Sequence, residues 1–546
     1  MRYDNGGELL VAVLRELGVE VVFGIVSVHN LPLVEAVDRE LRFVPVRHEA
    51  SAVNAADAYG RSRDGIGCAL TSTGTGAGNA AGSLVESLSA GASVLHVTGQ
   101  IESRYLGGGR GFIHETRDQL GMLRAVSAHA AAVGSAEDAG RVLRAAAAAA
   151  LATPGGPASV EWPIDLQYAR QTDRSEPPAR AALPHPAGSG LRAAAEALAT
   201  ARRPLVWAGG GAGRAGRQLR TLLEATGAGL LTSNSGRGAV PEDHPQVIGN
   251  FATAPAARAL LADADVLLTV GTHFRSNETA DYALALPATH LQIDADAAAL
   301  GRVYPVTHPL HGEAARVLAA LTDALPSDAR PQESWGARVS GVRADVRAAL
   351  HDSIGPQAAV CDALRAALPR RAVVARDVTI PSSSWGNRLL ELYDPRDNVF
   401  PRGGGIGQGL GMGIGAALAR PDEPTVVLAG DGGLAVHLGE LLTLAQERPR
   451  LTLLVFNDGG YGVLRNMQDA YAERRSGVDL CTPDFAGLAA ACGLPYARVA
   501  APEEAAPVIG EAVAAHGPTL VEVDLVALGP MKNPFTPPVK IPAAGA

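Results

Sequence analysis

Two segments in the last third of the chain decide its fold: TVVLAGDGG at residues 425–433 and LTLLVFNDGGYG at residues 451–462. Each opens with an apolar run that shows no polar alternation, which is typical of a strand in a parallel sheet covered on both faces. Each run leads into a carboxylate among glycines, Asp431 in the first segment and Asp458 in the second. Because the carboxyl ends of parallel strands share one edge of a sheet, we expect both carboxylates at that edge.

The same alternation of short apolar runs with alanine-rich helical stretches extends over the whole chain. Examples are VEVVFGI at residues 19–25, ADVLLTVG at 264–271 and TLVEVDL at 519–525. Strands separated by helices predict an α/β protein, and 546 residues are enough for about three domains. The fold class that we expect is therefore α/β, with three doubly wound parallel-sheet domains.

Two stretches rich in proline, glycine and charge, at residues 168–190 and 325–334, are typical of linkers. They predict an N-terminal domain over residues 1–170, a central domain over 188–326, a C-terminal domain over 345–530 and a tail over 531–546.

Composition excludes several classes of protein. Hydrophobic residues make up 47% of the chain and charged residues 19%, so buried cores are expected and disorder is not. A net charge of −9 argues against a nucleic-acid or anionic-membrane partner, and 4% aromatic residues leave few surfaces for stacking bases. The only lysines are Lys532 and Lys540, so the body of the chain holds no Schiff-base or P-loop lysine.

Cysteine usage and apolar runs bear on the location of the protein. The four cysteines form no CxxC pair, so neither a zinc site nor a disulfide framework is expected, and the pattern fits a reducing compartment. The N-terminus has no basic region followed by an apolar core, and the longest apolar run, near residues 144–152, is too short to span a bilayer. The sequence predicts a cytoplasmic protein.

Three further features suggest chemistry at the strand ends. Glycines around Asp431 and Asp458 allow the backbone to approach a phosphate, and carboxylate oxygens are the ligands that Mg²⁺ prefers. In the first domain, RHE at residues 47–49 follows the apolar run FVPV, so Glu49 is expected at a strand tip, in an apolar site where ionisation is costly. Two more glycine-rich segments are TGTGAGN at residues 73–79 and RGGGIG at residues 402–407.

Together these motifs resemble those of thiamine diphosphate (ThDP)-dependent enzymes of the acetolactate synthase, benzoylformate decarboxylase and 5-guanidino-2-oxopentanoate decarboxylase-like family. The family motif is a Gly-Asp-Gly followed at this spacing by a pair of asparagines, and Asp458 stands here in place of the second asparagine. The resemblance covers nearly the whole chain and implies three domains of the ThDP-binding fold.

The resemblance also implies roles for single residues. Mg²⁺ would be held by Asp431, Asp458 and the backbone carbonyl of Gly460, unless a one-position slip gives the ligand role to Asn457. Glu49 would hydrogen-bond N1′ of the aminopyrimidine and promote removal of the thiazolium C2 proton. The other residues expected to contact ThDP are Gly404 (at the 4′-amino group), Ile406 (under the bent middle of the cofactor), Thr73, Asn79, Gly430, Gly432, Gly433 and Tyr461.

Family resemblance implies self-association as well. In these enzymes the cofactor lies between the first domain of one subunit and the third domain of another. A homodimer is therefore expected as the smallest active unit, with a homotetramer as the other candidate.

Two segments with a histidine narrow the choice within the family. GGGRGFIHETRDQ at residues 107–119 and VHN at residues 28–30 resemble the 2-oxo acid decarboxylases more than acetolactate synthase. His114 and His29 would then lie near the reacting carbon. Either one could supply a proton or orient the substrate carboxylate, because histidine titrates near neutrality. We favour His114, which Glu115 and Asp118 could orient.

Two departures weaken the acetolactate synthase interpretation. Met467 stands where that enzyme has a tryptophan that selects its second oxo acid, and VGTHFRSNET at residues 270–279 lacks the run that accompanies FAD there. We expect a ThDP- and Mg²⁺-dependent decarboxylase of a small-molecule 2-oxo acid, which can also join the intermediate to an acceptor carbonyl. The alternatives are an acetolactate synthase-type carboligase and a non-catalytic flavin or nucleotide binder.

The segment GAGRAG at residues 211–216 fits the GxGxxG pattern of dinucleotide sites. Such a site needs an acidic residue at the end of the next strand, where this chain has Thr232, Ser233 and Asn234. The pattern therefore favours a tight turn that packs a helix on a sheet.

Overall fold

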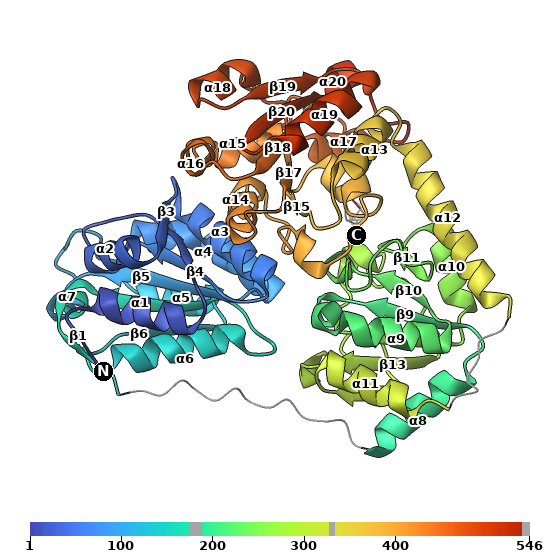
Figure 1. Ribbon diagram of the computed structural model, residues 1–546, viewed down its shortest axis with the longest axis horizontal. Helices are drawn as coiled ribbons and strands as arrows, with labels where there is room; N and C mark the ends of the chain where they lie inside the picture. Colours follow the sequence, from blue (N-terminus) through green and yellow to red (C-terminus); the bar gives the residue numbers. More distant parts are fainter. Residues whose placement is uncertain (175–187, 327–332, 538–546) are drawn as a thin grey trace.

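The protein is described by a computed structural model that covers residues 1–174, 188–326 and 333–537. Three six-stranded sheets form the framework, and every strand pair within them is parallel (Figure 1). Helices flank each sheet, so the prediction of an α/β protein with three parallel-sheet domains is confirmed. The strands that decided this expectation are buried, since the runs 425–430 and 451–456 have no exposed residue.

The N-terminal domain has the strand order β3-β2-β4-β5-β7-β6. Its strands are β2 (Val21–Gly24), β3 (Arg42–Pro45), β4 (Gly67–Thr71), β5 (Val94–Gln100), β6 (His129–Ala132) and β7 (Ala158–Pro163). Its helices are α1 (Gly6–Glu16), α2 (Leu31–Glu40), α3 (Glu49–Arg63), α4 (Thr75–Ala90), α5 (Gln119–Val126), α6 (Ala139–Leu151) and α7 (Ile164–Tyr168).

The central domain has the strand order β11-β10-β9-β12-β13-β14. Its strands are β9 (Pro204–Ala208), β10 (Gly229–Thr232), β11 (Val247–Gly249), β12 (Val266–Val270), β13 (Thr289–Asp294) and β14 (His308–His311). Its helices are α8 (Gly188–Thr200), α9 (Gly216–Thr226), α10 (Pro255–Asp263) and α11 (Ala314–Ala324).

The C-terminal domain has the strand order β16-β15-β17-β18-β20-β19. Its strands are β15 (Val373–Arg376), β16 (Asn398–Val399), β17 (Thr425–Gly430), β18 (Leu451–Asn457), β19 (Tyr496–Val499) and β20 (Thr519–Asp524). Its helices are α13 (Gln357–Ala367), α14 (Gly409–Ala419), α15 (Asp431–Val436), α16 (Glu440–Glu447), α17 (Gly462–Tyr471), α18 (Phe485–Ala491), α19 (Ala505–Ala514) and α20 (Leu525–Leu528).

Regions expected as linkers contain regular structure at their ends. In the first, β8 (Gln171–Thr172) pairs antiparallel with β1 (Arg2–Tyr3) and ties the end of the N-terminal domain to its beginning. After the second, α12 (Trp335–Ser353) runs through the expected start of the C-terminal domain at residue 345. The rest of both linkers and the end of the tail, residues 175–187, 327–332 and 538–546 with Lys540, lie outside the described residues.

Helix α12 joins the central and C-terminal domains. The indole nitrogen of its buried Trp335 donates a hydrogen bond to the carbonyl of Pro204 in the central domain, at 3.0 Å. Residues of both domains share one hydrophobic core, in which Trp207 of the central domain and Trp385 of the C-terminal domain are both fully buried. The two domains therefore form one continuous packing unit on this side.

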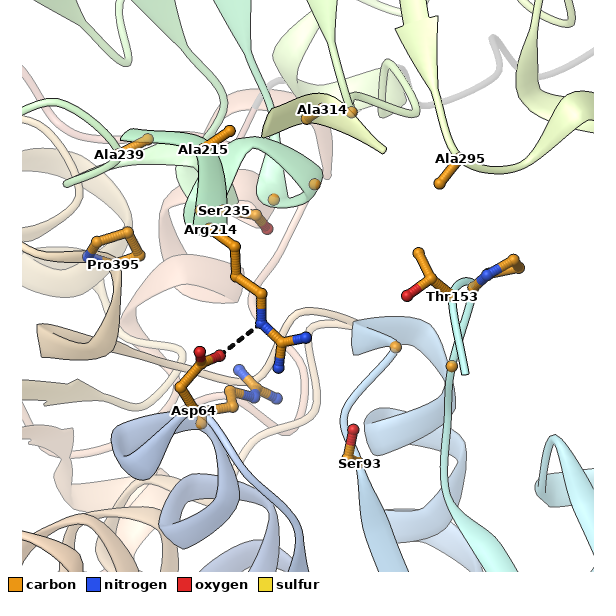
Figure 2. Close-up of a pocket in the computed structure, with 18 of the residues that line it drawn as sticks. Asp64, Ser93, Thr153, Arg214, Ala215, Ser235, Ala239, Ala295, Ala314 and Pro395 are labelled. Atoms are coloured by element: carbon orange, nitrogen blue, oxygen red, sulfur yellow. Dashed lines mark hydrogen bonds and ion pairs between the residues drawn. The ribbon is translucent and has the colours of Figure 1, made fainter. Parts of the chain in front are cut away.

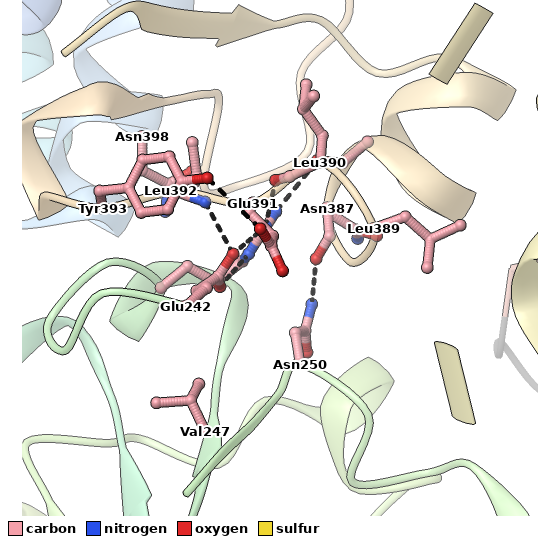
Figure 3. A network of polar contacts seen from close by, with 12 residues as sticks. Glu242, Val247, Asn250, Asn387, Leu389, Leu390, Glu391, Leu392, Tyr393 and Asn398 are labelled. Carbon is pink, nitrogen blue, oxygen red and sulfur yellow. Dashed lines mark hydrogen bonds and ion pairs between the residues drawn. The ribbon is translucent and has the colours of Figure 1, made fainter. Parts of the chain in front are cut away.

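Polar contacts reinforce the same junction (Figure 3). The buried guanidinium of Arg237 binds the Glu242 carboxylate at 2.7 and 2.6 Å and also donates to the carbonyls of Gly386 and Leu390. Glu242 in turn accepts the backbone N–H of Leu392 at 2.9 Å. Arg237 and Glu242 both belong to the central domain, and their hydrogen bonds to backbone groups of Gly386, Leu390 and Leu392 connect it to the C-terminal domain. Removing either partner would leave the other charge buried and uncompensated at this junction.

The N-terminal and C-terminal domains meet through α3 and α14, which lie against one another (Figure 1). A Cβ placed on Gly415 of α14 would lie 2.0 Å from the carbonyl oxygen of Ala55 on α3, so only glycine permits this approach. Glycine-rich α14 nevertheless forms a helix from Gly409, with its residues buried from Gly409 to Leu418. Among the described residues, no helix is long and apolar enough to cross a membrane.

Candidate functional site

Two aspartates lie at the carboxyl edge of the C-terminal sheet. β17 and β18 are parallel neighbours, Asp431 directly follows β17 as the first residue of α15, and Asp458 directly follows β18. The Asp431 side chain is buried and accepts the backbone N–H of Gly460 at 2.8 Å. Oδ1 of Asp458 is buried and has no hydrogen-bond partner, and Arg465 Nη1 is 3.8 Å away.

The pKa values of both carboxyls are raised, chiefly by burial. Burial raises the pKa of Asp431, and burial together with the charge of Asp431 raises the pKa of Asp458 to about 6. Two carboxylates that repel one another, one of them with an unpartnered buried oxygen, form a donor set that suits a hard divalent cation. The residues present therefore fit a bound Mg²⁺.

Backbone and ring atoms complete this edge of the site. A Cβ placed on Gly432 would lie 2.8 Å from the ring of Tyr461 and 3.2 Å from the carbonyl oxygen of Gly460, so that carbonyl lies beside the helix start. Both ends of the Asn457 amide have partners, because its Oδ1 accepts the backbone N–H of Gly459 at 3.3 Å and its Nδ2 donates to Glu522 of β20 at 2.7 Å. The sequence left the ligand role open between Asn457 and Asp458, and only Asp458 has a free buried oxygen here.

The glycine loop before α14 is held by two carboxylates that sequence reasoning missed. Glu86 of α4 accepts the backbone N–H groups of Gly403 and, at 3.1 Å, Gly405. Asp377 accepts those of Gly407 and Gly409, both at 3.1 Å, and burial raises its pKa to about 6. Asp377 follows the apolar strand β15 just as Asp431 follows β17, and that parallel is the signal that could have identified it.

Ile406 lies between these two anchors. Its side chain is 41% exposed, and Gly404 beside it has a φ of +92°, which glycine adopts without strain. An exposed aliphatic side chain on a loop whose backbone is fixed on both sides suits contact with an apolar part of a bound molecule.

Glu49 and Asn79, predicted in separate segments, meet in the N-terminal domain. Glu49 is the first residue of α3 and only 8% exposed, and its Oε2 accepts a hydrogen bond from Asn79 Nδ2 at 3.0 Å. Gly76 lies against the same carboxyl, since a Cβ there would be 2.9 Å from Oε1. The expected apolar surroundings of Glu49 thus include an amide partner from α4.

His29 and His114 also meet. Their Nδ1 atoms lie 3.4 Å apart and their ring centroids 5.2 Å apart, and His29 is buried. Burial and the neighbouring His114 lower the pKa of His29. These rings lie in the loops that follow β2 and β5, at the carboxyl edge of the sheet where Glu49 follows β3.

The carboxylates that we expected to orient His114 have other partners. Glu115 accepts the backbone N–H groups of Gly109 and Phe112, and such backbone hydrogen bonds hold its pKa below the usual range. Asp118 caps α5 by accepting the N–H of Gly121 at 2.7 Å. The ring partner of His114 is instead His29, a pairing that the sequence did not reveal.

Comparison with known proteins assigns the three domains to one family. Residues 4–122 match the N-terminal TPP (thiamine pyrophosphate) binding domain of thiamine pyrophosphate enzymes, residues 191–321 their central domain, and residues 381–523 their C-terminal TPP binding domain. The chain is 34% identical to a probable 2-ketoarginine decarboxylase of Pseudomonas aeruginosa, over 90% of this chain and 88% of that protein. The chain belongs to the thiamine pyrophosphate enzyme family.

Acetolactate synthases are relatives as well. The chain is 30% identical to the acetolactate synthase of Mycobacterium bovis, over 93% of this chain and 86% of that protein. The chain is 27% identical to a probable acetolactate synthase large subunit of Methanocaldococcus jannaschii, over 95% of this chain and 91% of that protein. This thiamine pyrophosphate enzyme therefore has relatives named for decarboxylation and relatives named for carbon–carbon bond formation.

A large cavity of this thiamine pyrophosphate enzyme lies away from these residues (Figure 2). It measures about 2070 Å³, and residues of all three domains line it, among them Ser93, Ala295 and Pro395. Arg214, from the GxGxxG-like segment, forms a 2.6 Å ion pair with Asp64 across it. The described residues that line this cavity include none of the predicted catalytic, metal or cofactor residues.

Proposed function

We propose that this enzyme is a ThDP- and Mg²⁺-dependent 2-oxo acid decarboxylase. The observation that carries the proposal is the buried Asp431–Asp458 pair, with its unpartnered Oδ1, at the start of a helix. A cation between these carboxylates would offset their repulsion, and the N–H groups at the start of α15 favour an anion such as a diphosphate.

Mg²⁺ would be held by Asp431, Asp458 and the carbonyl of Gly460. Asn457 is the weaker candidate ligand, because its Oδ1 already accepts the backbone N–H of Gly459. The residues proposed to lie against the cofactor are Gly404, Ile406, Gly430, Gly432, Gly433, Asn457 and Tyr461 of the C-terminal domain and Thr73 and Asn79 of the N-terminal domain.

When bound, ThDP supplies a nucleophilic carbon and an electron sink for the loss of CO₂ from a 2-oxo acid. Glu49 is the proposed proton carrier toward the cofactor's aminopyrimidine. Its burial at the start of α3, with Asn79 as amide partner, holds the carboxyl in one orientation. An oriented carboxyl that exchanges a proton contributes to rate only while it keeps that orientation.

His29 and His114 are the proposed acid–base groups toward the substrate. Two imidazoles with nitrogen atoms 3.4 Å apart disfavour a positive charge on both rings at once, and burial together with His114 lowers the pKa of His29. A proton from one of the rings could pass to the carbon that has lost CO₂, a step that precedes release of the aldehyde. A site without such a donor would favour an acceptor carbonyl and hence carboligation.

Self-association and a cytoplasmic location belong to the proposal. Large aliphatic side chains are exposed near the candidate site, with Val85 at 48%, Val436 at 47% and Ile406 at 41%, and a second copy of the chain would cover them. We propose a homodimer or homotetramer. All four cysteines are free, as expected in a reducing compartment such as the cytoplasm.

The test is to incubate the protein with ThDP, Mg²⁺ and a panel of 2-oxo acids. The panel includes pyruvate and 5-guanidino-2-oxopentanoate, the 2-ketoarginine of the Pseudomonas relative's name. A decarboxylase releases CO₂ and an equal amount of aldehyde. An acetolactate-type product in place of aldehyde would establish the second candidate function, a carboligase, which the acetolactate synthase relatives favour. No CO₂ from protein that has bound ThDP would refute the proposal, and flavin absorbance in the purified protein would point to the non-catalytic binder.

A further inference from the structure

A buried glutamine, Gln119, joins two glycines of the N-terminal domain. Its Oε1 accepts hydrogen bonds from the N–H of Gly74 at 2.8 Å and from the hydroxyl of Thr73 at 2.9 Å. Its Nε2 donates to the carbonyl of Gly99 at 3.1 Å and to the Glu161 carboxyl at 3.2 Å. All the donors and acceptors of the Gln119 amide are therefore used, in a site where the residue is 2% exposed.

The two glycines that Gln119 joins are also the ones that the backbones of the two histidines approach closely. A Cβ placed on Gly74 would lie 2.6 Å from the backbone oxygen of His114, and one on Gly99 would lie 2.3 Å from the backbone oxygen of His29. The separation of Gly74 and Gly99, which Gln119 bridges, thus determines how close the two histidine loops come.

Glu161 sets which way the Gln119 amide faces. The same Glu161 Oε2 accepts from Gln119 Nε2 and, at 3.3 Å, from Gln100 Nε2, and burial raises the pKa of this carboxyl. A flipped Gln119 amide would direct its oxygen at this acceptor oxygen and its N–H groups at the N–H of Gly74. The arrangement with the amide oxygen toward Gly74 is the one that satisfies every partner.

We propose that Gln119 is a positioning residue that sets the spacing of the His29–His114 pair. This inference rests on the proposed decarboxylase function, in which that pair donates a proton. Gln119 lies beneath the histidine loops and bonds neither ring, so it acts through Gly74 and Gly99.

The decisive variant is Gln119→Leu, which keeps the approximate volume and removes the four hydrogen bonds. With saturating ThDP and Mg²⁺ we expect kcat to fall by about tenfold or more with little change in KM, because small misplacements of reacting groups have large rate effects. We also expect the pKa of His29, followed by NMR of labelled imidazoles without substrate, to move upward toward its ordinary value as the rings separate.

Gln171→Leu is the matched control. Gln171 is 1% exposed in the same domain and donates to the carbonyls of Leu166 and Ala169, neither of which belongs to a histidine loop. The Gln171→Leu variant should keep the wild-type kcat and the wild-type histidine titration. Its unfolding midpoint, measured in parallel, shows whether the variant is folded. If Gln119→Leu does not fold, Glu161→Gln, which releases the amide orientation, should show the same changes in smaller measure.

A folded Gln119→Leu variant with wild-type kcat and an unchanged His29 titration would overturn the inference. Equal losses in Gln171→Leu would also overturn it, since they would show a general effect of a lost buried amide. Failure of the proposed function itself is distinguishable, because the wild-type enzyme would then release no CO₂ while the His29 titration could still respond to Gln119→Leu.

Discussion

Two sheets of this enzyme each have a pair of like side chains at the carboxyl edge: two aspartates in the C-terminal domain and two histidines in the N-terminal domain. In the C-terminal domain, burial raises the pKa of Asp431, and burial together with the charge of Asp431 raises the pKa of Asp458. In the N-terminal domain, burial and the neighbouring His114 lower the pKa of His29. At both edges the charged form is disfavoured, and this is the basis of the proposed cation site and of the proposed proton donor.

The largest effect is expected at Glu49, the proposed proton carrier of the N-terminal domain. Glu49→Gln removes the proposed proton carrier while keeping the shape of the side chain and its contact with Asn79. We expect kcat to fall by about 10³-fold, with folding and most ThDP binding retained. Turnover and ThDP titration of the variant provide the measurement, and wild-type turnover in it would contradict the role of Glu49.

The acidic pair is tested next by Asp431→Asn. Loss of one charged ligand should weaken Mg²⁺ binding by at least about 100-fold, because even loss of an outer-shell partner costs 10–100-fold. Mg²⁺ titration of ThDP-dependent activity measures this shift. Asp362→Asn, at an exposed carboxylate of α13 that pairs with His351, is the control and should leave the titration unchanged. Equal behaviour of the two variants would show that Asp431 holds no metal.

The histidine pair is probed by His114→Asn. Asparagine tolerates the φ of +66° at this position, so the backbone is preserved. We expect a loss of kcat of about tenfold to a hundredfold, with a larger share of carboligation product. The pKa of His29 should rise toward its ordinary value, because His114 is one of the two causes, with burial, that lower it. His244→Asn in the central domain serves as the control, and an unchanged product ratio would argue against proton donation by His114.

The smallest effect is expected on stability: Asp458→Asn should lose function yet increase the free energy of unfolding of the metal-free enzyme. A carboxyl whose pKa is raised on folding stabilises the protein below its unfolded pKa and loses that contribution as pH rises through the folded value. Asp458, with a pKa of about 6, therefore destabilises the metal-free enzyme at pH 7. We expect Asp458→Asn to raise the free energy of unfolding by about 1–2 kcal/mol with EDTA at pH 7 and to change little at pH 4. Urea unfolding at the two pH values measures it, and a destabilised variant at pH 7 would contradict the account.

The two pairs also show what sequence could predict. Asp431 and Asp458 follow apolar strands directly, so the rule that parallel strands end at one edge was enough to place them together. The three parallel sheets were predicted from apolar runs of this kind, which recur along the whole chain. The regions called linkers contain β8 and the start of α8, because composition alone does not show the pairing of β8 with β1 or the packing of α8 on α11 and β14.

The histidine pair was predicted only as two separate residues. His29 and His114 lie on loops after different strands, and their contact depends on the close approach of each loop to a glycine. Glu115 and Asp118 were expected to orient His114 because they are near in sequence, yet both bind backbone N–H groups. Glu86 and Gln119 were missed for a related reason: their partners lie far away in the chain and leave no pattern in the sequence. Asp377 was missed although it follows a strand directly, as Asp431 does.

The most direct test of the central claim is the release of CO₂ from 2-oxo acids by the wild-type enzyme. With ThDP and Mg²⁺ we predict one CO₂ and one aldehyde for each oxo acid consumed, and loss of the activity when either ThDP or Mg²⁺ is withheld. Protein with bound ThDP that releases no CO₂ from any 2-oxo acid would contradict the account.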